Sequence, residues 1–450
     1  MHKGVSAFPI LASALCASIA AQTASSPSLI VSLKDALERA TKYGAQIETA
    51  NIAAQLAKED HAQAKAAALP SAEAINQFIY TEGNGTPSGV FVANDGVHVY
   101  NEQAHLHQEL LSAVRRGEIR FAAAAEAVAR AKADVAARGL TATVIQDYYG
   151  IANAERRLKN AQTSLQEAQH FFDISQKQER GGEAAHADVI KAQIQVQQRQ
   201  RDVQDSQLTV VKTKNTLAVL IFPSLLSDYE IVDDMSQLPA LQTFAEANTQ
   251  ATAANPDVQA AQATVTQAKT GVSVARYGYL PSFGLDFWYG INANQFAAQT
   301  NYPTYATGRS TFPAVEVPFR QNLGYSAAAT LNVPVWNWGA IHSKVKQASL
   351  RERQAELDFS MTQKQVQAEL SSFYQEAQTA LSQIPSLRSS SELSAESLRL
   401  TVLRYQAGEA TALEVVDAQG TANLARNAYD DGLLRYRAAM ANLQTLTGTF

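Results

Sequence analysis

Apolar residues recur at every seventh position over long stretches of this chain. Between positions 112 and 220 they form two runs, which are Val144, Ile151, Leu158, Leu165 and Phe172, followed by Val189, Val196, Val203, Val210 and Leu217. The stretch 112–180 contains no proline and is rich in Ala, Gln, Glu, Arg and Lys, which are good helix formers. A heptad stripe stays against a neighbouring helix when the helices supercoil left-handedly. The pattern predicts a helical hairpin over about 112–220 that turns near 181–183.

The second half of the chain repeats this spacing in Val415, Ala422, Tyr429, Tyr436 and Leu443. It predicts a second hairpin over about 337–447 that turns near 407–411. The first helix of the first hairpin would have about 69 residues, and a helix of this length extends on the order of 100 Å. Pro385 lies inside the second hairpin and should kink or interrupt its helix. A bend toward the turn and an incidental kink are both open interpretations.

Four shorter segments alternate apolar and polar residues instead. The clearest apolar sets are Phe283, Leu285, Phe287, Tyr289 and Ile291, and then Leu323, Tyr325, Ala327, Ala329, Leu331 and Val333. The period of two predicts strands over about 71–82, 97–110, 282–292 and 322–333, joined in pairs by loops at 83–96 and 292–321. Alternation over roughly ten residues fits a transmembrane β-barrel, although a soluble sandwich would alternate equally well.

Four strands cannot close a barrel by themselves, and open sheet edges are not tolerated in lipid. If these strands span a membrane, other copies of the chain must complete the barrel. A sheet of four strands that spans a membrane would therefore require an oligomer.

The chain also repeats itself at long range. Gly182-Glu183-Ala184 returns as Gly408-Glu409-Ala410, and Leu69-Pro70 returns as Leu280-Pro281. The offsets are 226 residues (408 − 182) and 211 residues (280 − 69). A repeat this long is one large unit made twice rather than a short-period solenoid. We predict two structural repeats, 22–225 and 226–450, each with two strands and one helical hairpin.

Composition excludes several classes of function. The net charge is −5, so no basic excess indicates nucleic-acid binding. Cys16 is the only cysteine, which leaves no disulfide framework. It lies in a segment that predicts a cleaved signal peptide over 1–21, and Leu15 is a poor match to the small residue that a lipidation site at Cys16 would need. The sequence shows no phosphate loop, nucleophile elbow or metal-ligand spacing, so we expect neither an enzyme nor a cofactor.

The chain resembles the TolC-like outer-membrane efflux proteins. The resemblance rests on 404–408 (Arg-Tyr-Gln-Ala-Gly), 417–419 (Asp-Ala-Gln) with Tyr429, 279–282 (Tyr-Leu-Pro-Ser) and 333–339 (Val-Pro-Val-Trp-Asn-Trp-Gly). It implies a membrane α+β fold, in which a trimeric 12-stranded transmembrane β-barrel with four strands per chain continues as a long periplasmic α-helical coiled-coil barrel. It further implies a homotrimer in the outer membrane of a Gram-negative bacterium, extending into the periplasm.

The resemblance also implies a role. Such a protein is the exit duct of a tripartite efflux or type I secretion system, and conducts substrates passively for an inner-membrane pump of the RND, ABC or MFS type. A periplasmic adaptor protein would contact the hairpin tips, here at Gly182, Glu183, Tyr405, Gly408 and Glu409. Drugs, metal ions and secreted polypeptides are all open as cargo. The alternative is a secreted coiled-coil structural or adhesion protein.

In this family the tips narrow to an acidic constriction, and the matching positions are Glu414 and Asp417. Asp188 corresponds to Glu414, whereas Lys191 stands where Asp417 stands in the other repeat. Two acids one turn apart are otherwise simply a solvated helix face. The family often has a basic residue where this chain has Ala410, so its gate ion pair must differ. Our hypothesis is that Lys191 pairs with Asp417 or Glu414 instead.

Other residues carry weaker signals. His105 and His107 share one strand face and could coordinate a metal, but the sequence shows no third ligand, which favours polar residues facing water in the lumen. Trp336 and Trp338 adjoin the junction between strand and helix. They fit either an aromatic belt at a membrane interface or packing beneath the barrel.

Overall fold

The computed structural model describes residues 29–81, 97–224, 229–292 and 323–448. The predicted signal peptide with Cys16, the loop 83–96 and the loop beyond Asn292 lie outside this range. Within the described ranges, every helix is too short or too polar to cross a membrane.

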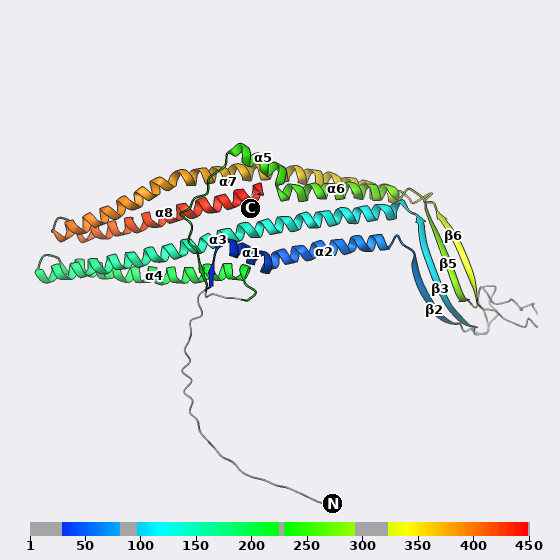
Figure 1. The fold of residues 1–450 in the computed structure, drawn as a ribbon, viewed down its shortest axis with the longest axis horizontal. Helices are drawn as coiled ribbons and strands as arrows, with labels where there is room; N and C mark the ends of the chain where they lie inside the picture. Colours follow the sequence, from blue (N-terminus) through cyan, green and yellow to red (C-terminus); the bar gives the residue numbers. More distant parts are fainter. Residues whose placement is uncertain (1–28, 82–96, 225–228, 293–322, 449–450) are drawn as a thin grey trace, which may run out of the picture.

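The two halves of the chain have the same succession of elements (Figure 1). The first half contains α1 (Leu33–Tyr43), α2 (Ala45–Ala66), β2 (Ser71–Thr81), β3 (Val97–Leu111), α3 (Ala113–Gly181) and α4 (His186–Ile221). The second contains α5 (Phe244–Ala254), α6 (Pro256–Tyr277), β5 (Ser282–Asn292), β6 (Leu323–Asn332), α7 (Ala340–Gln406) and α8 (Ala412–Thr447). Matched helices have equal lengths of 11 residues in α1 and α5, 22 in α2 and α6, and 36 in α4 and α8.

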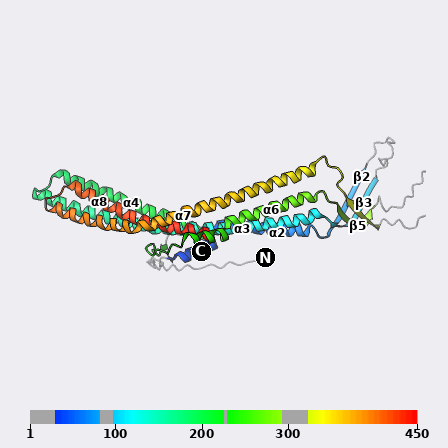
Figure 2. The same ribbon diagram turned by 90° about the horizontal axis from the view of Figure 1, so that it is seen from above.

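The long helices form two antiparallel hairpins, α3–α4 and α7–α8, which lie side by side because α3 also packs on α8. Figures 1 and 2 show both turns at one end of the molecule and the sheet at the other. α7 continues through Pro385 without interruption, so of the two expected effects of this proline only a kink is compatible with the structure.

Helices α2 and α6 extend the helical region toward the sheet and had no counterpart in the expected elements. α2 packs on α3, and α6 packs on both α3 and α7. Both end shortly before a Leu-Pro pair, 69–70 or 280–281, and a strand follows at once. Because proline disfavours the helical conformation of the residue before it, this pair separates helix from strand in each half.

The four longer strands form one antiparallel sheet in the order β2-β3-β5-β6. β3 and β5, one from each half, are the central neighbours, and β2 and β6 are the edges. On one face the side chains are mostly apolar, and many of them are exposed: Phe78, Leu106, Leu285, Phe287, Tyr289, Leu323, Tyr325 and Leu331. The opposite face carries polar residues, which include Glu73, His105, His107, Asp286 and Ser326.

The larger hydrophobic core lies where α1, α3, α4 and α8 meet the segment that links the two halves. Within this segment, β4 (Tyr229–Ile231) pairs in parallel with β1 (Leu29–Val31). The buried Tyr148 hydroxyl donates to the carbonyl oxygen of Val232 at 2.8 Å and accepts from its N–H at 3.1 Å. Tyr436 donates to the carbonyl oxygen of Pro239 at 2.5 Å. Hydrogen bonds from α3 and α8 thus hold the linking segment against both helices.

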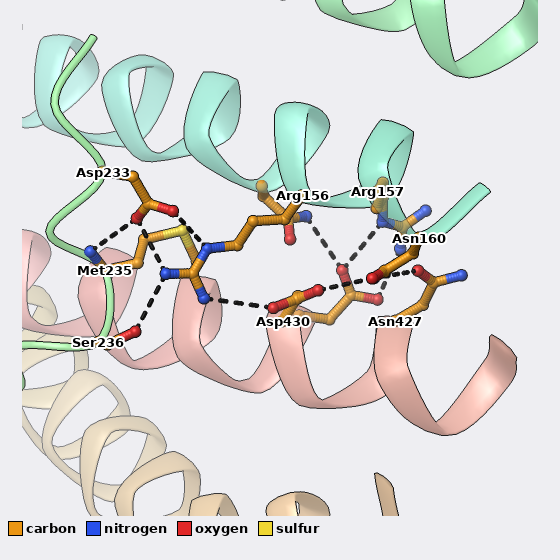
Figure 3. Close-up of polar contacts among 10 residues, drawn as sticks. Arg156, Arg157, Asn160, Asp233, Met235, Ser236, Asn427 and Asp430 are labelled. Carbon is orange, nitrogen blue, oxygen red and sulfur yellow. Dashed lines mark hydrogen bonds and ion pairs between the residues drawn. The ribbon is translucent and has the colours of Figure 1, made fainter. Parts of the chain in front are cut away.

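A polar seam between α3 and α8 adds to this core (Figure 3). Arg156 donates to both carboxylate oxygens of Asp233 at 2.6 and 3.0 Å and to Asp430 of α8 at 3.3 Å. One turn further along α3, Asn160 donates to the other oxygen of Asp430 at 2.8 Å. Because Asp430 is almost fully buried, these hydrogen-bond donors offset the cost of burying its carboxylate. The seam fixes the two hairpins relative to each other and so positions their tips.

Candidate functional site

Each long hairpin turns on a glycine in the left-handed conformation, with φ of 77° at Gly182 and 76° at Gly408. The backbone hydrogen bonds are the same in both turns: Gly182 N–H to Glu179 O (2.9 Å), Glu183 N–H to Gln178 O (2.8 Å), Gly408 N–H to Tyr405 O (3.0 Å) and Glu409 N–H to Arg404 O (2.8 Å). This is the Schellman pattern, which satisfies the last carbonyls of a helix and favours glycine at the left-handed position. The two tips therefore share one backbone design.

The side chains that close the two tips are different. At the first tip His186 lies 2.6 Å from a carboxylate oxygen of Glu179. At the second, Arg404 donates to the carbonyl oxygen of Glu409 at 3.1 Å and forms an ion pair with Glu414 at 3.6 Å. Arg404 was not among the predicted site residues. It provides a positive charge at this tip, where position 410 is an alanine. The same backbone turn is thus accompanied by a different side-chain contact in each repeat.

Glu414 has a local structural role that the sequence reasoning missed. Its carboxylate accepts hydrogen bonds from the N–H and the hydroxyl of Thr411, both at 3.1 Å, and Thr411 accepts from the N–H of Glu414 at 3.3 Å. This capping box begins α8. The backbone and hydroxyl donors of Thr411, with the charge of Arg404, lower the pKa of Glu414. In the first repeat Ala185 is the N-cap and supplies no side-chain hydrogen bond.

The predicted gate residues are not all brought together within one chain. Lys191 pairs with Asp188, three residues earlier on α4, at 3.6 Å. In the part of the chain that the structure describes, Lys191 has no ion pair with Glu414 or Asp417, and Asp417 is an exposed carboxylate without an ion pair. The hypothesis of a pair between Lys191 and either acid stays a prediction that concerns neighbouring chains.

Tyr405 is buried rather than displayed at the tip. Its ring meets Phe171 edge to face with centroids 5.1 Å apart, and its hydroxyl donates to Ser175 at 3.3 Å. Together with Ile174, Ala192, Ala412 and Val415 these side chains form a second small core in which all four long helices take part. A contribution of Tyr405 to partner binding would therefore be indirect. The exposed residues of the predicted adaptor contact are Gly182, Glu183, Gly408 and Glu409.

The structure places a carboxylate beside His105 and His107 that the sequence did not reveal. Asp286 lies opposite His107 in the β3–β5 pairing, and its carboxylate contacts both imidazoles. Trp336 and Trp338, at the start of the second hairpin, meet edge to face and are 75% and 89% exposed. Packing of these two indoles beneath the sheet is therefore not seen within one chain.

Comparison with solved structures shows which proteins share this fold. The outer-membrane channel CmeC of Campylobacter jejuni superposes with a TM-score of 0.76 at 16% identity, over 92% of this chain and 85% of that one. A membrane protein from Pseudomonas aeruginosa gives 0.77 at 19% identity, over 92% and 93%. The outer membrane protein VceC of Vibrio cholerae gives 0.73 at 16% identity, over 92% and 96%. The fold is that of the outer-membrane channels.

Sequence comparison finds a family model that matches the second half of the chain. Residues 248–449 match the family model described as outer membrane efflux protein. The resemblance to outer-membrane efflux proteins is thereby confirmed. No curated protein is similar enough in sequence to be matched to the chain.

Proposed function

We propose that this chain is the exit duct of a tripartite efflux or type I secretion system in the outer membrane of a Gram-negative bacterium. Three copies would form a barrel of twelve strands, four from each chain, and the helical hairpins would continue it as a tunnel through the periplasm. An inner-membrane pump would supply the substrate, and the duct itself would conduct it passively.

The observation that carries this proposal is the sheet. One face exposes mostly apolar and aromatic side chains, with Asn76 and Glu102 among them, and the other is mostly polar. The two edges, β2 and β6, have no partner strand among the described residues. Lipid would cover the apolar face, but it offers no hydrogen bonds to an open edge. Pairing of β2 in one copy with β6 in the next satisfies both edges and closes the sheet.

The edge pairing can be tested by cysteine cross-linking, because Cys16 is the only native cysteine and lies in the predicted signal peptide. One cysteine at Ala74 in β2 is combined with a scan along β6 from 325 to 331. Oxidation should give covalent dimers and trimers at matched positions. The control places the first cysteine at Leu106 in β3, which is already paired on both sides and should give no cross-links.

A second test addresses the membrane. The protein should require detergent for release, run as a trimer and form ion-conducting pores in planar bilayers. A monomer that salt or shear releases would instead indicate a coiled-coil structural or adhesion protein, and would overturn the proposal.

The tips would be the periplasmic entrance. The exposed Gly182, Glu183, Gly408 and Glu409 would meet the adaptor protein, and the first turns of α4 and α8 would line the constriction. Rings of carboxylates around a pore favour cations. Because Lys191 offsets Asp188 and Arg404 offsets Glu414, we assign the main acidic ring to Asp417.

A further inference from the structure

We infer that His105, His107 and Asp286 form a binding site for a divalent transition-metal ion on the polar face of the sheet. The two histidines are two residues apart on β3, so the strand period places both side chains on one face. Asp286 of β5 lies directly opposite His107, and Trp288 lies opposite His105. Three candidate ligands from the two halves of the chain thus meet at the centre of the sheet.

The three side chains already converge. His107 Nδ1 lies 2.7 Å and His105 Nε2 lies 3.0 Å from the same oxygen, Oδ1 of Asp286. All three ligand atoms lie within 4.8 Å of one another. A tetrahedral ion with bonds of about 2.0–2.1 Å would place its ligand atoms roughly 3.3 Å apart. Small side-chain rotations are enough to reach that spacing, with the ion in place of the imidazole protons.

Trp288 restrains the ring of His105, and the exposed His107 leaves a path from solvent to the site. The ring of His105 stacks on Trp288, with centroids 4.8 Å apart and planes within 5°, which restrains the direction of its nitrogens. The side chains of His105 and Asp286 are 18% and 19% exposed, whereas that of His107 is 46% exposed. An ion can therefore enter beside His107 and meet two ligands that are already positioned.

A fourth ligand is available from the neighbouring strand. Glu73 of β2 is exposed and lies opposite His105 in the β2–β3 pairing. Residues opposite each other in an antiparallel pair have Cβ atoms about 4.5–5.5 Å apart, within reach of a glutamate side chain. Glu73 or water would complete the coordination.

The ligand set indicates the kind of ion. Two imidazoles with a carboxylate suit Zn²⁺, Cu²⁺, Ni²⁺ and Co²⁺, whereas Ca²⁺ and Mg²⁺ prefer sites made wholly of oxygen. Bound here, the ion would join β3 of the first half to β5 of the second and so stabilise the sheet. This inference does not depend on the proposed export function.

The test uses the purified full-length protein in detergent, stripped with a chelator and titrated with Zn²⁺ by calorimetry and with Cu²⁺ by electron paramagnetic resonance. We expect one tightly bound ion per chain, a Cu²⁺ spectrum with two imidazole nitrogens, and no competition from Mg²⁺. His107→Asn and Asp286→Asn should each weaken binding by about 100-fold, and Trp288→Leu, which removes only the stacking partner, by about 10-fold.

The matched control is His170→Asn, which changes an exposed histidine on α3 and should leave binding unaltered. Unchanged affinity in both His107→Asn and Asp286→Asn would overturn the inference. If these variants do not fold, the wild-type spectrum decides alone, because fewer than two imidazole nitrogens on the tightest Cu²⁺ also overturns it.

Discussion

Lys191 forms an ion pair with Asp188, three residues earlier on the same helix, and the Nζ and Oδ1 atoms are 3.6 Å apart. At the corresponding place in the second repeat, Asp417 and Glu414 are both acidic. The two tips therefore present different charges on the same backbone turn. In an oligomer of such chains, the start of α4, where Lys191 offsets Asp188, would alternate with the more acidic start of α8 around the entrance.

Replacing Lys191 by glutamate should raise the single-channel conductance in planar bilayers. The change removes the pair with Asp188 and adds negative charge to the proposed constriction, where the tips would repel one another. An exposed pair of this kind contributes about 0.2–1 kcal/mol in each chain, so the effect depends on copies acting together.

Lys212→Glu is the matched control for this change. Lys212 is exposed on α4 and lies 21 residues (212 − 191) after Lys191, which is three heptads along and roughly 30 Å away on the same face. Its conductance should equal that of the wild type. Unchanged conductance in Lys191→Glu would remove Lys191 from the gate.

Asp417→Asn should reduce cation selectivity more than Glu414→Gln does. Asp417 is exposed and has no ion pair in the described chain, whereas Glu414 is held by Thr411 and Arg404. Reversal potentials across a salt gradient measure the difference. Glutamine can still make the capping box, so the comparison changes charge with little effect on the helix end. A larger shift in Glu414→Gln would assign the ring to Glu414.

Heptad runs such as Val144 to Phe172 predicted long helices, because each run extends over many helical turns. The structure has α3 and α7 ending at Gly181 and Gln406, next to the two glycines that mark the turns. Neither α2 nor α6 was predicted. α2 buries only Ile47, and the run in α6 is short, with Val258, Val265 and Val272.

Two features of the site were not predicted from the sequence. The contact between His107 and Asp286 spans 179 residues and depends on which strands pair and in what register, which alternation alone does not specify. The cap at Thr411 did have a signal, because Thr-x-x-Glu before an apolar run is a capping box. Glu414 was assigned to the constriction from the family resemblance, and its hydrogen bonds to Thr411 were not predicted.

Arg156→Ala should destabilise the junction of the hairpins far more than Arg157→Ala. Arg156 is 20% exposed and pairs with both Asp233 and Asp430, so its removal would leave the two carboxylates partly unpaired. Charge-assisted hydrogen bonds of this kind contribute about 1.5–3 kcal/mol. Arg157 and its partner Asp431 are 47% and 44% exposed, and such pairs contribute about 0–1 kcal/mol.

Thermal unfolding of the two variants in detergent gives the comparison, and hydrogen exchange should show faster opening of residues 229–239 in Arg156→Ala. Equal melting temperatures for the two variants would mean that the seam does not hold the linking segment.

Acid should loosen the start of α8. The pKa of Glu414 is lowered in the folded chain from the ordinary value of 4.5 by its bonds to Thr411. A carboxyl of this kind stabilises the folded state above its unfolded pKa, and the contribution is lost as the pH falls through the lower folded pKa. Amide hydrogen exchange over 412–416, corrected for intrinsic rates, should therefore accelerate below about pH 4.5.

Two variants separate the cap from general acid effects on the tip. Glu414→Gln retains a capping side chain that does not titrate, so exchange at the start of α8 should lose most of its pH dependence. Thr411→Ala removes the cap at every pH and should lower protection about fivefold even at neutral pH. The start of α4, where Ala185 provides no side-chain cap, is the internal reference. Identical pH profiles in the wild type and Glu414→Gln would show that the carboxylate does not hold the helix end.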